Sequence, residues 1–284
     1  MGFNLGPEAT HLSYFASLVQ SDEQFPLLEA AASLAQDEYP ECDVQQVLAD
    51  VDQMLARLKR RLAPDASALH RLKILNRLFF EELGFQGNVN HYHDPDNSFL
   101  NAVLQTRRGI PISLSVIWLE LAQAIGLQAK GVSFPGHFLV KINLTYPNEG
   151  LVVLDVFAGR SLTREDLLER LCEFPDLDQA MNATQNSPGH EADPGSDEDR
   201  DQKLDKPVGQ ELGQDLGKAS DPASTDHLGN LEGERRLQRF LRPASERQIV
   251  ERMLHNLLTI YRAQHDRPRE DQVMERLRIL RFGA

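Results

Sequence analysis

The feature that most constrains the fold is the apolar run that begins at Pro111. Residues 111–125, PISLSVIWLELAQAI, are apolar almost all round, so a helix formed by them has to be buried on every side. Proline suits the first turn of such a helix, because the N–H that it lacks would have no partner there. Gly126 follows the run, as glycine often does at a helix C-terminus. The run therefore predicts a central helix with other elements packed around it.

Two segments after this helix have the pattern of strands. HFLVKI (137–142) and LVVLDVF (151–157) are rich in β-branched and aromatic residues, and the turn-like NLTYPNEG separates them. Such runs on either side of a turn signal are typical of paired strands. We predict two adjacent antiparallel strands that follow the central helix.

Helices are predicted before and after this central segment of the sequence. In residues 1–100, apolar side chains recur at intervals of three and four, and they do so again in residues 236–284, where Asp266 to Pro268 interrupt the pattern. The fold class is therefore α+β. We expect a helical N-terminal layer, a core over 101–180 with the buried helix against an antiparallel sheet, and a C-terminal helical hairpin packed on that core.

An acidic stretch, residues 181–235, separates the core from the hairpin. Its central part, residues 184–233, holds 12 acidic and 4 basic residues and no Phe, Trp or Tyr. So few large apolar side chains cannot offset the entropy cost of ordering the chain. We predict a disordered linker that contributes much of the net charge of −13.

Composition excludes several functional classes. A chain with 43 acidic and 30 basic residues repels phosphate backbones, so we expect no nucleic-acid partner. No run of about 18 apolar residues or signal-peptide pattern is present, which predicts neither a membrane partner nor secretion. Cys42 and Cys172 are too few for a disulfide framework. These features predict a cytoplasmic protein without a cofactor, for which a protein or peptide partner remains possible.

Three residues could combine chemically: Ser113, His137 and Asp155. His137 shares a strand face with Leu139, and Asp155 shares one with Val153, so a hairpin can place the imidazole beside the carboxylate. We expect the carboxylate to hold Nδ1 and leave Nε2 directed at the start of the central helix, near Ser113. The alternatives are a purely structural His–Asp hydrogen bond and a Ser113 that only caps or packs the helix.

Four segments of the chain resemble a known family. They are NSFLNAVLQTRRGIPISLSVIWLELAQAIGL, GVSFPGHFLVKI, LDVFAGRSLTREDL and FLRPASERQIVERMLHNLLTIYRAQHD. These are similar to the bacterial SirB-type family, with RRGIPISLS and FPGHFL as the most specific signatures. The resemblance implies a transglutaminase-like, papain-like core followed by tetratricopeptide-like helices.

The same resemblance implies site residues. Enzymes of the wider superfamily carry a catalytic Cys at the start of the central helix, then a His and an Asp on the next two strands. His137 and Asp155 match the second and third members. Counted without gaps from the helix end, the cysteine position falls at Pro111, and Ser113 lies two residues further on. Neither cysteine of the chain lies at this position.

Two further groups of residues have the composition of ligand sites. Arg107, Arg108 and Arg160 flank the helix start and the Asp strand, and could hold a carboxylate or phosphate of a substrate, or else pair with acidic neighbours. HYHDPD, residues 91–96, has metal-like composition, but a turn stabilised by Asp side chains explains it better, so no metal site is predicted.

Two functional classes therefore remain. One is a degenerate, cysteine-less domain of binding or regulatory function. The other is a hydrolase or acyl transferase in which Ser113 is the nucleophile, His137 the base and Asp155 the residue that orients it. We favour the binding domain, because a serine hydroxyl is a much weaker nucleophile than a thiolate and depends on an aligned base.

Overall fold

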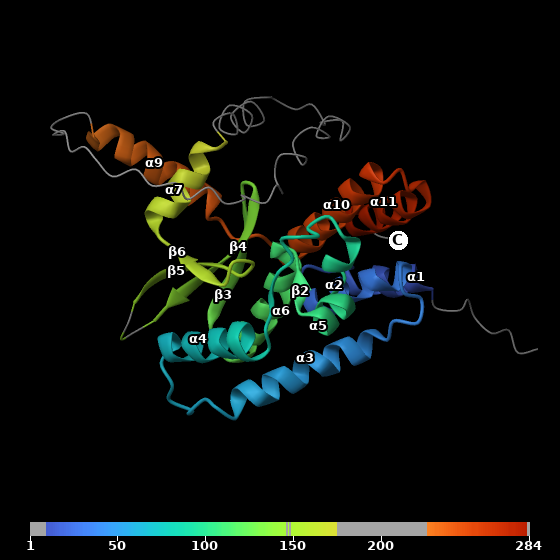
Figure 1. The fold of residues 1–284 in the computed structure, drawn as a ribbon, viewed down its shortest axis with the longest axis horizontal. Coiled ribbons are helices and arrows are strands. Elements are labelled where there is room, and N and C mark those ends of the chain that lie inside the picture. The colour runs from blue at the N-terminus through green and yellow to red at the C-terminus, as the bar shows by residue number, and fades with distance from the viewer. Residues whose placement is uncertain (1–9, 146, 148, 175–225, 283–284) are drawn as a thin grey trace, which may run out of the picture.

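The computed structural model describes residues 10–145, 147, 149–174 and 226–282 (Figure 1). It combines helices with an antiparallel sheet, which confirms the α+β prediction. The four strands of the sheet are neighbours in chain order, β3-β4-β5-β6. None of the helices in the described part of the chain is long and apolar enough to cross a bilayer.

The N-terminal layer is helical, as predicted. Its elements are α1 (His11–Leu18), α2 (Leu27–Ser33), the 3₁₀ helix η1 (Leu34–Asp37), α3 (Val44–Lys59), α4 (Ala68–Asn76) and the π-helical turn η2 (Arg77–Glu82). Short polar side chains begin several of them: Thr10, Asp43 and Ser67 accept backbone N–H groups at the starts of α1, α3 and α4. Such caps satisfy N–H groups that the helix itself leaves unpaired.

A loop with little regular structure joins this layer to the central helix. It contains β1 (Gln86–Gly87), η3 (Pro95–Asn97), α5 (Leu100–Thr106) and β2 (Arg108–Gly109). The sequence analysis predicted a turn at residues 91–96 in this loop but did not predict α5. Strands β1 and β2 pair in parallel, which brings Gly87 opposite Gly109.

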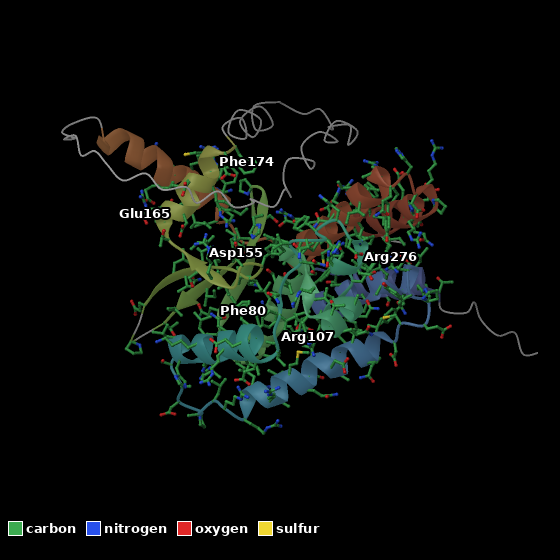
Figure 2. All side chains as sticks on the ribbon, viewed as in Figure 1. Phe80, Arg107, Asp155, Glu165, Phe174 and Arg276 are labelled. Carbon is green, nitrogen blue, oxygen red and sulfur yellow. The ribbon has the colours of Figure 1, made fainter. Side chains whose placement is uncertain are left out.

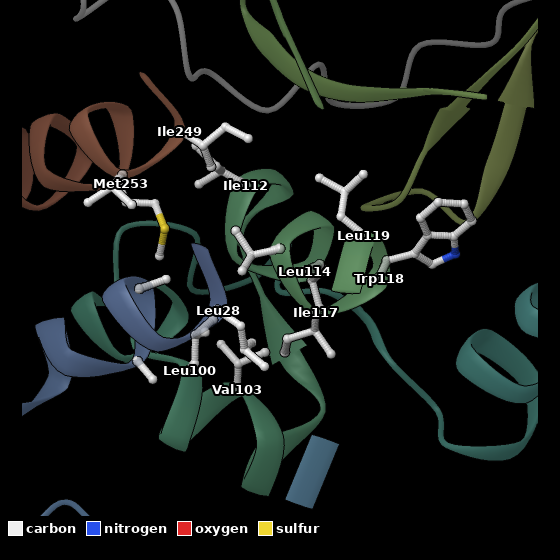
Figure 3. Packing of buried hydrophobic residues seen from close by; sticks show 14 of the residues in the cluster. Leu28, Leu100, Val103, Ile112, Leu114, Ile117, Trp118, Leu119, Ile249 and Met253 are labelled. Carbon is white, nitrogen blue, oxygen red and sulfur yellow. The ribbon is translucent and has the colours of Figure 1, made fainter. Parts of the chain in front are cut away.

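The central helix α6 (Pro111–Ala124) starts at Pro111, as predicted. Its buried side chains point in all directions (Figure 3). The neighbours that surround it in the hydrophobic cluster include Leu28 of α2, Leu100 and Val103 of α5, and Ile249 and Met253 of α10 (Glu246–Ala263). The N-terminal layer, the central helix and the C-terminal helices thus share one continuous core.

The sheet has four strands rather than two. They are β3 (Gln128–Phe134), β4 (His137–Leu144), β5 (Gly150–Asp155) and β6 (Arg160–Leu162). The two predicted strands correspond to β4 and β5. Strand β3 has a weaker pattern because Gly131 and two polar residues interrupt it, and β6 is only three residues long.

The two faces of the sheet pack against different helices. On the α6 side lie Ala129, Phe138, Val140, Ile142 and Leu154, which belong to the main core. On the other side lie Val132, Phe134, Leu139, Val153 and Leu162, which form a second cluster with α7 (Arg164–Cys172) and α9 (Asp226–Phe240). Figure 1 shows α7 and α9 together at the end of the molecule away from α10 and α11.

The C-terminal hairpin consists of α10 and α11 (Arg267–Phe282), which confirms the predicted break at Asp266–Pro268. It packs on the N-terminal layer through a buried arginine: Arg276 of α11 is 0% exposed and pairs with Asp37. The predicted linker is wrong at its end, because residues 226–235 belong to helix α9. The remainder of that predicted linker, up to residue 225, lies outside the described residues.

Candidate functional site

His137 is the first residue of β4 and follows a tight turn. Pro135 and Gly136 form this turn, with Gly136 at φ 67°, and β3 pairs Phe134 with His137 across it. Proline followed by a residue with positive φ is typical of a type II turn. The turn therefore positions the imidazole at the end of the hairpin, where its side chain remains 15% exposed.

Asp155 is the last residue of β5 and lies beside His137, as the strand alternation predicted. Nε2 of His137 is 2.9 Å from Oδ1 of Asp155. The same oxygen accepts a hydrogen bond from the backbone N–H of Ala158 at 3.0 Å, and Oδ2 accepts one from Nη2 of Arg170 at 3.1 Å. The carboxylate is 1% exposed, so these bonds satisfy a group that would otherwise be costly to bury.

The surroundings of Asp155 favour its charged form. Burial by itself would raise the pKa of this carboxyl. The hydrogen bond and charge of His137, the N–H of Ala158 and the charge of Arg170 outweigh burial, so the pKa lies below its usual value. Asp155 is therefore a charged carboxylate at neutral pH.

The orientation of the imidazole differs from the prediction. Nε2, not Nδ1, contacts Asp155. His137 and Asp155 also lie on the sheet face that carries Leu139 and Val153, which packs against α7 and α9 rather than α6. The imidazole nitrogen expected to point toward the start of α6 is thus the one bound to the carboxylate.

Ser113 is in the first turn of α6 and is 0% exposed. Its hydroxyl donates to the carbonyl of Asn97 at 2.6 Å and accepts the N–H of Ile110 at 3.1 Å. Gly109 provides room for it, since a Cβ at Gly109 would lie 2.8 Å from Ser113 Oγ. These bonds match the capping alternative, and among the described residues Ser113 makes no hydrogen bond to His137.

The three arginines do not gather around the His–Asp pair. Arg107, which has φ 59°, lies over the Phe85 ring at 4.7 Å, and burial lowers the pKa of its guanidinium. Arg108 donates to the carbonyl of Gly84 at 3.2 Å. Figure 2 shows the labelled Arg107 well away from Asp155. Both arginines therefore support the loop before α6.

Arg160, unlike Arg107 and Arg108, lies next to Asp155, with which it pairs across the β5–β6 ladder. Its guanidinium is 55% exposed and lies 3.7 Å from Asp166. The cation that reaches Asp155 is instead Arg170 of α7, which the sequence analysis did not single out. Leu167, Arg170 and Leu171 are spaced so that they share one helix face. This spacing, in a helix that follows the strand with the buried Asp155, is the sequence signal that could have identified Arg170 as a partner of that carboxylate.

A row of aromatic rings connects the loop to His137. Phe157 lies edge-on to His137 at 6.0 Å and to Tyr92 at 5.9 Å between ring centroids. Gly87 allows this packing, because a Cβ there would be 2.4 Å from the Phe157 ring. The row places the loop of residues 87–97 beside the His–Asp pair.

The HYHDPD segment forms the predicted turn. Asp94 caps η3 by accepting the N–H of Asp96, and Asp96 accepts the hydroxyl of Tyr39. No group of three or more His, Cys, Asp or Glu side chains in the described part of the chain could hold a metal ion. Burial and the charge of Asp43 raise the pKa of the Cys42 thiol, and neither Cys42 nor Cys172 is disulfide-bonded.

Comparisons with known proteins agree with this architecture. A family model described as the transglutaminase-like superfamily matches residues 45–185. A UPF0162 protein of Xylella fastidiosa (strain 9a5c) is 38% identical over 175 residues, which is 60% of this chain and 61% of that protein. A UPF0162 protein of Vibrio cholerae is 32% identical over 149 residues, covering 51% of this chain and 54% of the relative.

A more distant relative shares a shorter segment. F-box only protein 21 of Homo sapiens is 37% identical over 70 residues, which is 25% of this chain and 11% of that protein. The match therefore spans about three fifths or less of each of these relatives' own length. No solved structure matches the chain significantly. Residues 45–185 of the chain are thus similar to the transglutaminase-like superfamily, and a little over half of the chain is similar to bacterial UPF0162 proteins.

Proposed function

We propose that this chain is a degenerate, non-catalytic member of the transglutaminase-like superfamily, without a cysteine at the start of its central helix, and that it has a binding or regulatory function toward a protein or peptide partner. In this proposal it is a SirB-type protein whose α10–α11 hairpin is a tetratricopeptide-like helix pair. Only this one pair occurs among the described residues, and about three repeats are needed for a stable solenoid. The hairpin therefore supports the core rather than forming an independent groove.

The observation that carries the proposal is the state of Ser113. Its proton is donated to Asn97 O at 2.6 Å, and its side chain is fully buried. A nucleophile needs a general base within about 3 Å. The hydroxyl of Ser113 instead links the start of α6 to the preceding loop, which is a structural role.

The residue at the expected cysteine position supports the same conclusion. Pro111 occupies the first turn of α6 and offers neither a hydroxyl nor a thiol. Its pyrrolidine ring also removes one of the N–H groups that a helix start could otherwise present to an oxyanion. A site built on this helix start lacks both a nucleophile and part of the usual electrostatic support.

The His137–Asp155 pair has a structural explanation as well. Through Arg170, Asp155 fastens α7 to the sheet, and through Ala158 N–H it shapes the turn after β5. Loss of one of these partners would leave a buried charge uncompensated, which is destabilising whether or not the chain catalyses a reaction. The pair is therefore compatible with a domain that has lost its nucleophile.

The alternative is a hydrolase or acyl transferase that uses Ser113, His137 and Asp155. What favours it is the 2.9 Å contact between His137 and Asp155, with the imidazole still partly exposed. For this activity Ser113 would have to lose its hydrogen bond to Asn97 O, and a ring nitrogen of His137 would have to come within hydrogen-bond distance of the Ser113 hydroxyl.

Covalent labelling distinguishes the two functions. We expect a fluorophosphonate probe to leave the purified full-length protein unlabelled, because the hydroxyl of Ser113 is bonded to Asn97 O rather than to a base. Ser115→Ala is the matched control for Ser113→Ala, since Ser115 also lies on α6 and is equally buried, with its hydroxyl bonded to Pro111 O. Labelling that disappears in Ser113→Ala but persists in Ser115→Ala would establish the enzyme and overturn the proposal.

A further inference from the structure

A strongly basic segment stands out in this acidic chain. Residues 57–82, from the last turn of α3 to the end of η2, hold seven Arg or Lys and three Asp or Glu. Their net formal charge is therefore +4, whereas the whole chain carries −13. Figure 1 shows α3 and α4 along one side of the molecule, away from α7 and α9. Positive charge is thus concentrated in one part of the protein.

Three arginines of this segment meet on one carboxylate. Arg57 Nη2 lies 2.9 Å from Oε2 of Glu82, and Arg61 donates to both oxygens of Glu82, with Nη2 2.7 Å from Oε2. Nε of Arg77 lies 3.9 Å from Glu82 and 3.9 Å from Glu81. Glu82 therefore joins the end of α3 and the start of η2 into one surface.

This cluster has more positive charge than Glu82 can compensate. The hydrogen bond from Arg61, together with the charges of Arg61, Arg57 and Arg77, outweighs desolvation and holds the pKa of Glu82 below its usual value. The side chains of Arg57, Arg61 and Arg77 remain 43%, 33% and 68% exposed. Because a guanidinium has five N–H donors, each arginine retains donors that Glu82 does not use.

Two further cations extend the surface. Lys73 lies one turn before Arg77, whose backbone N–H bonds to Lys73 O, so their side chains lie on the same side of the helix. Arg60 is the C-cap of α3 and directly precedes Arg61. Both Lys73 and Arg60 are exposed, and neither forms an ion pair with any residue that the structure describes. We define the basic patch as Arg57, Arg60, Arg61, Lys73 and Arg77.

The loop that joins the two parts of the patch is held in place by another arginine. Arg71 donates to Ala66 O at 2.9 Å and to Pro64 O at 3.3 Å. It also donates to Ile125 O, directly after α6, at 2.8 Å. These bonds fix the loop against the core. The patch is therefore preorganised, which lowers the entropy cost of binding a ligand.

The contacts of Glu82 indicate which ligand group suits the patch. Arg61 donates to both carboxylate oxygens, the bidentate geometry typical of Arg–carboxylate pairs. Binding to a membrane surface normally combines basic with apolar side chains. In the described part of the chain, the large hydrophobic residues that are exposed all lie outside residues 57–82: Val89, Leu151, Met274 and Phe282. The patch is thus better suited to a carboxylate ligand than to a membrane.

The charge of the remaining chain favours a short acidic ligand over a nucleic acid. Residues outside 57–82 include 40 of the 43 acidic residues but only 23 of the 30 basic ones. A long polyanion that extends beyond the patch therefore meets negative charge. A short acidic peptide segment can be bound by the patch alone.

We propose that the basic patch binds an acidic segment of a partner protein, whose Asp and Glu carboxylates pair with the patch arginines as Glu82 does. The inference names the class of partner for the binding function proposed above and rests on that function. Its test does not involve Ser113. Probe labelling at Ser113 would overturn the proposed function without changing this result, and failure of the patch to bind would leave the labelling result unchanged.

The test measures fluorescence anisotropy of fluorescein-labelled decaglutamate with the full-length protein, at low and at physiological ionic strength. The patch variant is Arg60→Glu with Lys73→Glu. Both side chains are exposed and have no ion-pair partner among the described residues, so we expect the variant to fold. The matched control is Arg242→Glu with Arg267→Glu, two exposed arginines outside the patch, which gives the same change in net charge.

We expect the unsubstituted protein to bind decaglutamate with an affinity that falls as the salt concentration rises, because salt screens exposed charges. The patch variant should bind about tenfold or more weakly. The control variant should remain within about twofold of the unsubstituted protein, because its changed charges lie outside the patch and are screened.

Absence of binding to the unsubstituted protein, or an equal loss in the two variants, would overturn the proposal. Preferential binding of an oligothymidylate of the same length, lost in the patch variant, would assign the patch to a nucleic acid instead. Preferential binding of phosphatidylserine vesicles, lost in the same variant, would assign it to a membrane. Either result would overturn the proposal as well.

Chemical modification of the unsubstituted protein gives a second test that needs no variant. Saturating decaglutamate should slow acetylation of the Lys73 amine by N-hydroxysuccinimide acetate about fivefold or more, because the bound peptide covers this amine. Lys130 is the internal control, since it lies outside the patch and is 53% exposed. Mass spectrometry measures both rates. An unchanged rate at Lys73, or equal slowing at Lys130, would show that the peptide does not cover the patch, and the proposal would fail.

Discussion

Nη2 of Arg170 lies 3.1 Å from Oδ2 of Asp155, while His137 contacts the other oxygen of the same carboxylate. The two partners come from different elements, β4 and α7, and meet on a carboxylate at the end of β5. Arg170 is 20% exposed and Asp155 1% exposed. This ion cluster explains how a strand can end in a buried acid and why α7 is held against the sheet.

We expect Arg170→Gln to destabilise the protein by about 3 kcal/mol, because it removes a cation from a buried carboxylate. Chemical denaturation measures the effect. Arg160→Gln is the control: its exposed, 3.7 Å contact with Asp166 should change stability by less than about 1 kcal/mol. Equal effects of the two substitutions would show that Arg170 is not the principal partner of Asp155.

The lowered pKa of Asp155 predicts a dependence of stability on pH. In the unfolded chain this carboxyl titrates near about pH 4, above its pKa in the folded protein. Its contribution to stability is therefore complete above about pH 4 and is lost as the pH falls through the folded pKa. Unfolding free energies measured from pH 6 down to acid should fall less steeply in Asp155→Asn.

Glu169→Gln, which removes an exposed carboxylate from α7, is the control for this pH series. Its profile should remain parallel to that of the unsubstituted protein. If Asp155→Asn also gives a parallel profile, the carboxyl is not held in its charged form by the fold.

Removing the hydroxyl of Ser113 should cost stability. Ser113→Ala leaves the N–H of Ile110 and the carbonyl of Asn97 without this partner in a buried region, and we expect a loss of about 2 kcal/mol. Ser115→Ala removes only a bond to Pro111 O within the same helix and should cost about 1 kcal/mol or less. Thermal denaturation of both variants tests the difference, and a reversed order would contradict the structural role of Ser113.

Gly87 should be intolerant of any side chain. A Cβ would lie 2.4 Å from the ring of Phe157, so Gly87→Ala must displace a ring that packs between Tyr92 and His137, at a cost of about 2 kcal/mol. Phe157→Leu in the same protein should restore part of this loss. Gly150→Ala, where no atom lies within 4 Å of the new Cβ, should have little effect, and denaturation midpoints of the three proteins provide the comparison.

The C-terminal hairpin should be an obligatory part of the fold. Arg276→Met leaves Asp37, 19% exposed, without its buried partner, and we expect a loss of about 3 kcal/mol. Adding Asp37→Asn should recover part of that loss, which a double-mutant cycle measures. The exposed Arg278–Glu275 pair is the control, and Arg278→Ala should change stability by less than about 1 kcal/mol.

Local sequence patterns were sufficient to predict much of the architecture. The start of α6 at Pro111, the β4–β5 pair and the break between α10 and α11 follow from proline geometry and from periods of two and about 3.6 residues. Strand alternation also predicted that His137 and Asp155 would meet, because they stand on one face of adjacent strands. These features depend on residues close in sequence or on one strand pairing.

The prediction for the site was incomplete because its missing partners come from other elements. Arg170 reaches Asp155 from a helix whose orientation depends on the packing of Leu167 and Leu171, and Arg107 and Arg108 turn toward the loop rather than toward a ligand. Likewise, residues 226–235 of α9 were included in the predicted linker and the rest of α9 in the predicted hairpin region, because only the tertiary structure shows that Leu237, Phe240 and Leu241 pack on the sheet.

The sequence by itself determined the α+β class, the buried central helix and the absence of a cysteine at its start, because helix and strand periods and residue identity are local properties. Only the tertiary structure decided which groups satisfy Ser113 and Asp155. Each of those polar groups is buried, and a buried group takes whichever partner the packing of distant elements brings within hydrogen-bond distance. For Ser113 that partner is Asn97 O, and for Asp155 it is Arg170 together with His137.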